Sequence, residues 1–188
     1  MKYDLGLIPM SAKPFHAGHY YLVQKAAAEC SRVKLFVGTG NRNKGGTAKI
    51  TGEKMLYLWK NFYEPYMPNK ENIEFIYEGV PVRNVYEELD EIKSNNVNIS
   101  IAVYSGKEID KKGKTLVQNR YQRLINDPYW NNTLTFVEVE RGEGESPDVS
   151  GTDMRRALTY YDSLKFIAGL PYYLNDRQKL DIFNILLK

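Results

Sequence analysis

Short apolar runs alternate with longer amphipathic segments along the whole chain, and this alternation limits the folds that it can adopt. The apolar runs are rich in branched and aromatic residues and have the length of strands. They cover residues 3–10, 32–39, 73–77, 97–104 and 133–139. Segments with the 3.6-residue apolar period of helices lie between and after them. These segments cover residues 17–29, 51–64, 82–94, 115–125, 150–160 and 176–187.

Strands that alternate with helices predict an α/β fold with a parallel sheet. We expect a doubly wound, Rossmann-like five-stranded sheet with helices on both faces and a short helical C-terminal extension. The 188 residues suit an α/β domain over residues 1–160 and the extension over 161–188. Ligands of such sheets bind beyond the carboxyl ends of strands. The loops after Met10, Val37, Tyr104 and Val139 are therefore the candidate ligand-binding loops.

Charge and composition narrow the classes of partner. The net charge is only +3, which does not suggest a nucleic-acid partner, because a nucleic-acid-binding protein would show a clustered basic face. Cys30 is the one cysteine, so an internal disulfide cannot form. No apolar run approaches the roughly 18 residues of a membrane span, and the N-terminus does not resemble a signal peptide. We expect a cytoplasmic protein without a membrane partner, and the fifteen tyrosines are compatible with a homo-oligomer.

Both histidines of the chain lie in one segment, Phe15-His16-Ala17-Gly18-His19, between the first strand and the first helix. Residues three apart share a helix face, and the N-terminus of a helix attracts anions. Gly18 is expected to keep this face open for a phosphate. Two imidazoles there can stabilise charge that develops on a phosphoryl group. The alternative is a pair of packing or surface histidines. Without a third histidine, we predict no metal ligands in the protein.

A second motif, residues 149–156, reads Val-Ser-Gly-Thr-Asp-Met-Arg-Arg and opens the helix after the fifth strand. Ser150 and Thr152 offer hydroxyls and backbone N–H groups at the helix start, and Arg155 or Arg156 follows one turn later. This arrangement suits the β- and γ-phosphates of a triphosphate. The alternative is that Ser150 and Asp153 form a helix cap that needs no ligand.

Residues 16–19 and 149–155 resemble the HxGH and ISGTxxR-type signatures of the HxGH nucleotidyltransferase superfamily, which includes adenylyltransferases and cytidylyltransferases. Residues 14–19 are most similar to the PFHxGH version in archaeal-type nicotinamide-mononucleotide adenylyltransferases and small phage relatives. Residues 10–13 depart from that branch, since Met-Ser-Ala-Lys stands in place of Gly-Arg-Phe-Gln. We expect Lys13 to substitute in part for the missing arginine.

The resemblance implies transfer of a nucleoside monophosphate, by preference AMP from ATP, to a phosphate-bearing acceptor such as nicotinamide mononucleotide. Direct in-line attack releases pyrophosphate, with Mg²⁺ as the cofactor. His16, His19 and Arg155 are the implied catalytic residues. The implied nucleotide-binding residues are Met10, Ser11, Lys13, Gly18, Ser105, Lys107, Ser150, Gly151 and Thr152. The loop after the second strand is the acceptor side, where Thr39, Asn41, Arg42 and Lys44 are the candidates.

The sequence alone leaves several alternative functions and residue roles open. A dehydrogenase-type dinucleotide site is disfavoured because Asn43 stands where Gly38-Thr39-Gly40 would need its third glycine. Cytidylyl transfer from CTP to a phosphorylated alcohol belongs to the same reaction class. A nucleotide sensor without catalysis would share the binding motifs. Trp59, Tyr86 and Trp130 are either base-stacking or core residues, and helical spacing favours the core.

Overall fold

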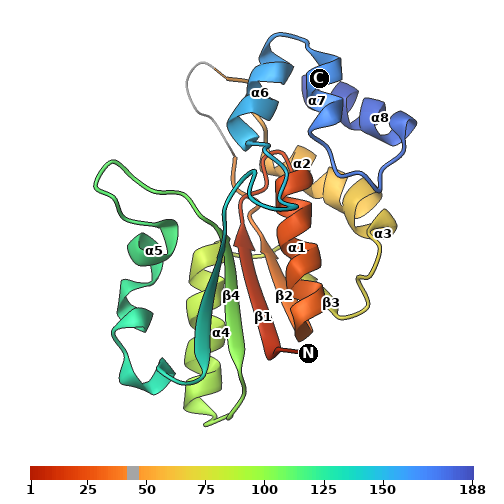
Figure 1. Ribbon diagram of the computed structural model, residues 1–188. Helices are drawn as coiled ribbons and strands as arrows, with labels where there is room; N and C mark the ends of the chain where they lie inside the picture. The colour runs from red at the N-terminus through yellow and green to blue at the C-terminus, as the bar shows by residue number, and fades with distance from the viewer. Residues whose placement is uncertain (42–46) are drawn as a thin grey trace.

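The sheet has the predicted parallel, doubly wound arrangement (Figure 1). The computed structural model describes residues 1–41 and 47–188. Its strands lie in the order β3-β2-β1-β4-β5, and every neighbouring pair is parallel. They are β1 Tyr3–Met10, β2 Cys30–Val37, β3 Ile73–Ile76, β4 Ile101–Gly106 and β5 Leu134–Val139. The predicted fold class is therefore confirmed.

Helices cover both faces of the sheet, and β1 contributes side chains to both layers. Leu5 and Leu7 pack with α4 (Pro81–Ser94) and α5 (Leu116–Ile125) on one face. Ile8 and Met10 pack with α1 (Ala17–Glu29) on the other face. Successive strand residues point to opposite faces, so a central strand covered on both sides must be apolar throughout. Figure 1 shows α1 and α4 on opposite sides of the strands.

The strand order reverses between β1 and β4. The chain runs outward from β1 through β2 to β3, and then crosses to β4 on the other side of β1. The loops that leave the carboxyl ends of β1 and β4 therefore diverge to opposite faces of the sheet. In open α/β sheets this divergence creates a crevice for ligands.

The segment predicted as one helix over residues 51–64 consists of three consecutive helical pieces. These are α2 (Gly52–Leu58), a π-helical turn η1 (Trp59–Tyr63) and α3 (Glu64–Tyr66). Thr51 caps α2 by accepting a hydrogen bond from the backbone N–H of Lys54. Pro65 has no N–H to donate to the preceding turn, and the π-helical turn ends two residues before it.

The C-terminal region folds as α6 (Gly151–Thr159), α7 (Ser163–Ala168) and α8 (Asp176–Leu187). The prediction for α8 is confirmed, but the six-residue α7 was missed because it is too short to show a clear period. Phe166 and Phe183 join the same core cluster as α1 and β1. The backbone N–H of Ala17 donates to the carbonyl of Gly169 at 2.9 Å, so this region supports the start of α1. The division into residues 1–160 and 161–188 stays a prediction.

Two further details of the prediction were wrong or incomplete. Residues 97–100 were expected in a strand, but β4 begins only at Ile101, and the N–H of Val97 donates to the last turn of α4. The short 3₁₀-helix η2 (Pro128–Trp130) was not expected. Trp59 and Trp130 are buried core residues, and Tyr86 packs against the core between α4 and α5. In the part of the chain that is described, no helix has the length and apolar character needed to cross a membrane.

Candidate active site

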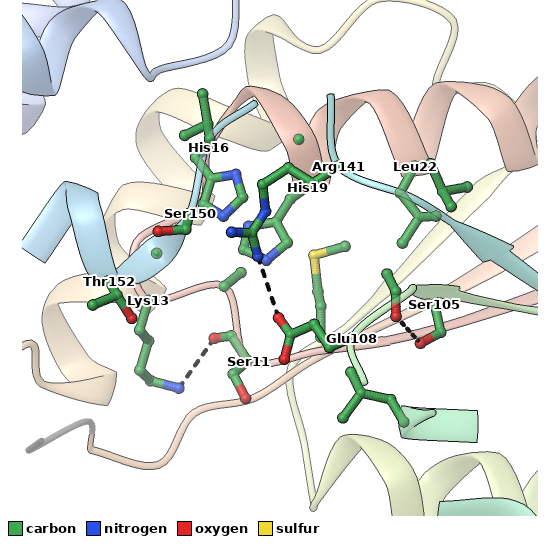
Figure 2. A pocket seen from close by; sticks show the side chains of 18 of the residues that line it. Ser11, Lys13, His16, His19, Leu22, Ser105, Glu108, Arg141, Ser150 and Thr152 are labelled. Atoms are coloured by element: carbon green, nitrogen blue, oxygen red, sulfur yellow. Dashed lines mark hydrogen bonds and ion pairs between the residues drawn. The ribbon is translucent and has the colours of Figure 1, made fainter. Parts of the chain in front are cut away.

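A cavity of about 640 Å³ opens at the carboxyl ends of β1 and β4, at the crevice expected from the strand order (Figure 2). Its walls come from the β1–α1 loop, the start of α1, the loop after β4, and the loop that runs from β5 into α6. All the residues predicted as catalytic or nucleotide-binding line it. They are Met10, Ser11, Lys13, His16, Gly18, His19, Ser105, Lys107, Ser150, Gly151, Thr152 and Arg155. The fold thus brings the two sequence motifs to one site.

The two histidines stack on each other at the start of α1. Their ring centroids lie 3.7 Å apart with an interplanar angle of 24°. Phe15 is nearly parallel to His19 at 5.9 Å. The Nδ1 atoms of His16 and His19 are buried and have no hydrogen-bond partner among the described residues. Because buried polar atoms are normally paired, these two nitrogens are an unusual feature of the histidine pair.

Both imidazoles are neutral near pH 7. Burial, with the nearby charge of Arg141, lowers the pKa of His19 to about 4. Burial holds the pKa of His16 well below its usual value, and the charges of His19, Arg141 and Arg155 lower it further. A neutral imidazole still carries one N–H, so each ring can donate one hydrogen bond to a phosphate oxygen. The site therefore combines hydrogen-bond donors with positive charge from neighbouring arginines.

Gly18 makes room for the ring of His16. A methyl group on Gly18 would lie 3.2 Å from Cε1 and 3.3 Å from Nδ1 of His16, and 3.6 Å from the carbonyl oxygen of Val149. The sequence predicted that this glycine keeps the helix face open for a phosphate. The neighbour that the structure places there is the imidazole of His16, so Gly18 positions the stacked pair.

Ser150 caps α6, as one of the two sequence interpretations proposed. Its Oγ accepts a hydrogen bond from the backbone N–H of Asp153 at 3.0 Å and donates to the Asp153 carboxylate. The same serine is buried at the cavity wall beside Thr152 (Figure 2). The cap and the cavity position are therefore compatible, because capping fixes the first turn of the helix that faces the cavity.

Arg155 ties α6 to the β1–α1 loop. It is 4% exposed, and its Nη1 donates to the carbonyl of Lys13 at 2.8 Å. Its Nη2 donates to Oγ1 of Thr152 at 3.0 Å. Arg156 also borders the cavity, but it is exposed and pairs with Asp153 at 3.4 Å. Arg155 is therefore both a structural link between the two motifs and a positive charge at the cavity wall.

Lys13 directs its ammonium group to backbone carbonyls. Its Nζ donates to the carbonyl of Gly38 at 2.6 Å and to that of Ser11 at 3.2 Å. Figure 2 shows the bond to Ser11. The side chain therefore fixes the β1–α1 loop against the end of β2. The expected role as a replacement for an arginine would require it to leave these carbonyls.

The residues predicted after β4 have different environments. Ser105 is buried, and its hydroxyl donates to the carbonyl of Gly106 at 3.0 Å. Lys107, which the resemblance places at the nucleotide, forms an ion pair with Glu140 at 2.9 Å, so its ammonium group already has a carboxylate partner.

The predicted acceptor residues do not line this cavity where they are described. Oδ1 of Asn41 accepts a hydrogen bond from the backbone N–H of Gly52 at 2.9 Å, and a methyl group on Gly52 would overlap the carbonyl of Thr39. The first N–H groups of a helix have no partner within the helix, and Asn41 supplies one for α2. Arg42 and Lys44 lie outside the described residues.

Several cavity residues were missed by the sequence reasoning. The most prominent are Glu108, Arg120, Arg141 and Ser146. Arg141 lies two residues after Val139, the last residue of β5. The rule that ligands bind beyond strand ends pointed to this loop, but it cannot say which side chain turns inward.

The buried histidines make stability depend on pH. The pKa of His19 is about 4 in the folded state and near the ordinary 6.5 when unfolded. Between these values the unfolded chain binds a proton that the folded protein does not, so the free energy of unfolding decreases as the pH falls below 6.5. At pH 5.5 the loss from this residue is about 1 kcal/mol relative to pH 7. Urea unfolding at the two pH values tests this. His19→Gln should show a smaller pH dependence, and an equal dependence in both proteins would contradict the assignment.

We expect Arg155→Ala to lower the free energy of unfolding by about 1–3 kcal/mol, because it leaves the buried carbonyl of Lys13 without this donor. Arg156→Ala is the matched control, since it removes an exposed pair on the same helix and should cost about 1 kcal/mol or less. Urea unfolding of the two variants at pH 7 measures the difference. Equal losses would show that Arg155 is not a structural link.

Comparisons with known proteins support the nucleotidyltransferase-like fold. Residues 5–49, well under half of the chain, match the family described as Citrate lyase ligase C-terminal domain. Two crystal structures of a bifunctional NMN adenylyltransferase/ADP ribose pyrophosphatase from Francisella tularensis are similar in fold. The structure complexed with AMP and a Mn ion is 15% identical, with a TM-score of 0.53 over 98% of this chain and 52% of its own. The other is 16% identical, with a TM-score of 0.59 over 99% of this chain and 50% of its own.

The chain thus spans about half the length of these two bifunctional proteins. A search of curated proteins finds no significant match. At this level of identity the likeness establishes the fold alone. The chain shares the α/β fold of these structures, and its candidate site is the cavity that the N-termini of α1 and α6 border.

Proposed function

We propose that the chain is a nucleotidyltransferase that transfers AMP from ATP to a phosphate-bearing acceptor, such as nicotinamide mononucleotide, and releases pyrophosphate. One observation carries the proposal: the N-termini of α1 and α6 border one cavity, which also contains a stacked pair of neutral histidines. The similarity to an adenylyltransferase structure complexed with AMP is a second support.

The triphosphate would lie across the two helix N-termini. Both supply backbone N–H groups and the positive end of a helix dipole, which together favour phosphate. The β- and γ-phosphates would lie near Ser150, Thr152 and Arg155. The α- and β-phosphates would lie near His16 and His19, with backbone groups of Met10 and Ser11 beside the α-phosphate. Ser105, Lys107, Gly18 and Gly151 complete the proposed nucleotide site.

The reaction would be a direct displacement at phosphorus. An oxygen of the acceptor phosphate forms a bond to the α-phosphorus, while the bond from that phosphorus to the bridging oxygen of the β-phosphate breaks. Pyrophosphate leaves, and no covalent enzyme intermediate forms. Catalysis of this kind depends on positioning and on stabilising the charge of the phosphoryl oxygens. The imidazole N–H groups of His16 and His19 would donate to these oxygens as their charge increases.

The proposed cofactor is Mg²⁺ that enters with the triphosphate. Mg²⁺ keeps several water ligands and takes one or two carboxylates plus substrate phosphates. The described residues contain no cluster of three side chains able to hold a metal, and the cavity wall offers the carboxylates of Glu108 and Asp153. This donor set fits an ion held chiefly by phosphate oxygens and water. The ion would neutralise part of the charge on the β- and γ-phosphates.

The acceptor would approach from the side of β2, where Thr39 and Asn41 precede α2 and where Arg42 and Lys44 follow in sequence. A basic residue there would suit the phosphate group of the acceptor.

Pyrophosphate release with Mg²⁺ tests the proposed reaction. ATP or CTP would be paired with nicotinamide mononucleotide or a phosphorylated alcohol. Release with ATP and nicotinamide mononucleotide supports the proposal. Release with CTP and the alcohol would instead assign cytidylyl transfer. Nucleotide binding without release by any pair would favour a sensor.

We expect His19→Ala to lower turnover at least about 100-fold with the fold retained, because it removes a donor to the reacting phosphoryl group. Turnover is measured from initial rates of pyrophosphate release, and circular dichroism checks the fold. Gln24→Ala is the control on α1, since Gln24 does not line the cavity and should leave the rate near that of the unchanged protein. Near-normal turnover of His19→Ala would remove this histidine from the mechanism.

A further inference from the structure

Arg141 extends from the loop after β5 toward the stacked histidines, and its guanidinium group lies between them and Glu108 (Figure 2). Its Nη2 lies 3.5 Å from Oε1 of Glu108 in the loop after β4. The charge of Arg141 lowers the pKa of both histidines, which agrees with a position close to their rings. This arginine therefore already points at the place where the proposed function requires a phosphate.

The pairing follows from the register of the sheet. Gly106 lies opposite Val139 where β4 and β5 end, and the N–H of Lys107 donates to the carbonyl of Val139 at 2.8 Å. The next residues continue this register, so Lys107 pairs with Glu140 and then Glu108 pairs with Arg141. Glu140 is not part of the cavity wall, whereas both Glu108 and Arg141 are. A ligand in the cavity therefore meets the second pair directly.

Glu108 is unusual in its surroundings, because the cavity wall is otherwise mainly basic. The cationic residues of the cavity wall are Lys13, Lys107, Arg120, Arg141, Arg155 and Arg156, and its acidic residues are Glu108 and Asp153. Asp153 is bound by Ser150 at the cap of α6. Within the described residues, Glu108 forms its one ion pair with Arg141. A phosphate that enters would be attracted to the same arginine and repelled by this carboxylate.

We propose that Arg141 binds the polyphosphate of the nucleotide, and that Glu108 is its counterion in the empty site and is displaced when the polyphosphate binds. The inference rests on the proposed function, because it names a further residue of that site. The exchange is favourable because the Arg141–Glu108 pair is long and both side chains are about half exposed, so it is weak. An arginine–phosphate contact is charge-assisted and often bidentate, so it is stronger.

The competition between Glu108 and a bound phosphate for Arg141 also favours ligands with several phosphates over ligands with one. A triphosphate carries more negative charge than a monophosphate and competes better with Glu108 for the guanidinium group. The site would therefore bind the triphosphate substrate in preference to ligands with a single phosphate. Removing the carboxylate should tighten the binding of any polyphosphate.

The test measures binding of inorganic tripolyphosphate to the full chain by calorimetry at one fixed ionic strength. Glu108→Gln should bind about threefold more tightly, as expected from releasing a weak exposed pair. Arg141→Gln should bind about tenfold or more weakly, because it loses a charge-assisted contact. In the Arg141→Gln background, the Glu108→Gln change should have no further effect, since the carboxylate acts through the arginine.

Glu145→Gln is the matched control. Glu145 is exposed in the same loop as Arg141 and does not line the cavity. Its replacement by glutamine changes the net charge by the same amount as Glu108→Gln. If Glu145→Gln tightened tripolyphosphate binding as much as Glu108→Gln does, the inference would be overturned. It would also be overturned if Glu108→Gln tightened binding by the same factor in the Arg141→Gln background. Binding with unaltered affinity in every variant overturns this inference alone. No binding by any of the proteins overturns it together with the anion site of the proposed function.

Discussion

The hydrogen bond from Arg155 to the carbonyl of Lys13 holds the two halves of the site together. It joins residues 142 positions apart in the sequence and is buried. Through it, the first turn of α6 lies against the loop that leads into α1. Gly151 permits this approach, because a methyl group there would lie 3.2 Å from Nη1 of Arg155. Both anion-attracting helix starts therefore border one cavity.

Burial also sets the chemistry of the histidines. The rings stack at 3.7 Å and are neutral near pH 7 because burial disfavours the charged form. Positive charge is supplied instead by arginines, which keep their charge in partly buried places. The C-terminal helices contribute at one further point, where the carbonyl of Gly169 accepts from the N–H of Ala17 at the start of α1.

Much of the fold could be predicted from the sequence, because each strand and each long helix carries its own period. The alternation of strands and helices also predicts that the sheet is parallel, but it does not fix the order of the strands. The positions of His16, Ser150 and Arg155 could be inferred because the motifs lie where strands end and helices begin. The pairing of Glu108 with Arg141 could not be predicted, since both residues lie in loops without periodicity.

The hydrogen-bond partners of individual side chains also could not be predicted from the sequence. Lys13 was expected at a phosphate, but its ammonium binds the carbonyl of Gly38, a contact that depends on how β1 and β2 end side by side. Asn41 was expected at the acceptor, but it supplies a hydrogen bond to the first turn of α2. In both cases the tertiary structure adds a contact within the protein that the sequence pattern could not predict.

The central claim is that a nucleotide triphosphate binds over the stacked histidines. The chain has two histidines, so proton NMR resolves their imidazole signals without extensive assignment. The most direct measurement is a titration with a non-hydrolysable ATP analogue and Mg²⁺. Both sets of signals should shift together and saturate at one ligand concentration, and the pKa of each ring should rise, because a nearby phosphate favours the protonated form. An analogue that binds tightly while both histidine signals stay unchanged would contradict the account.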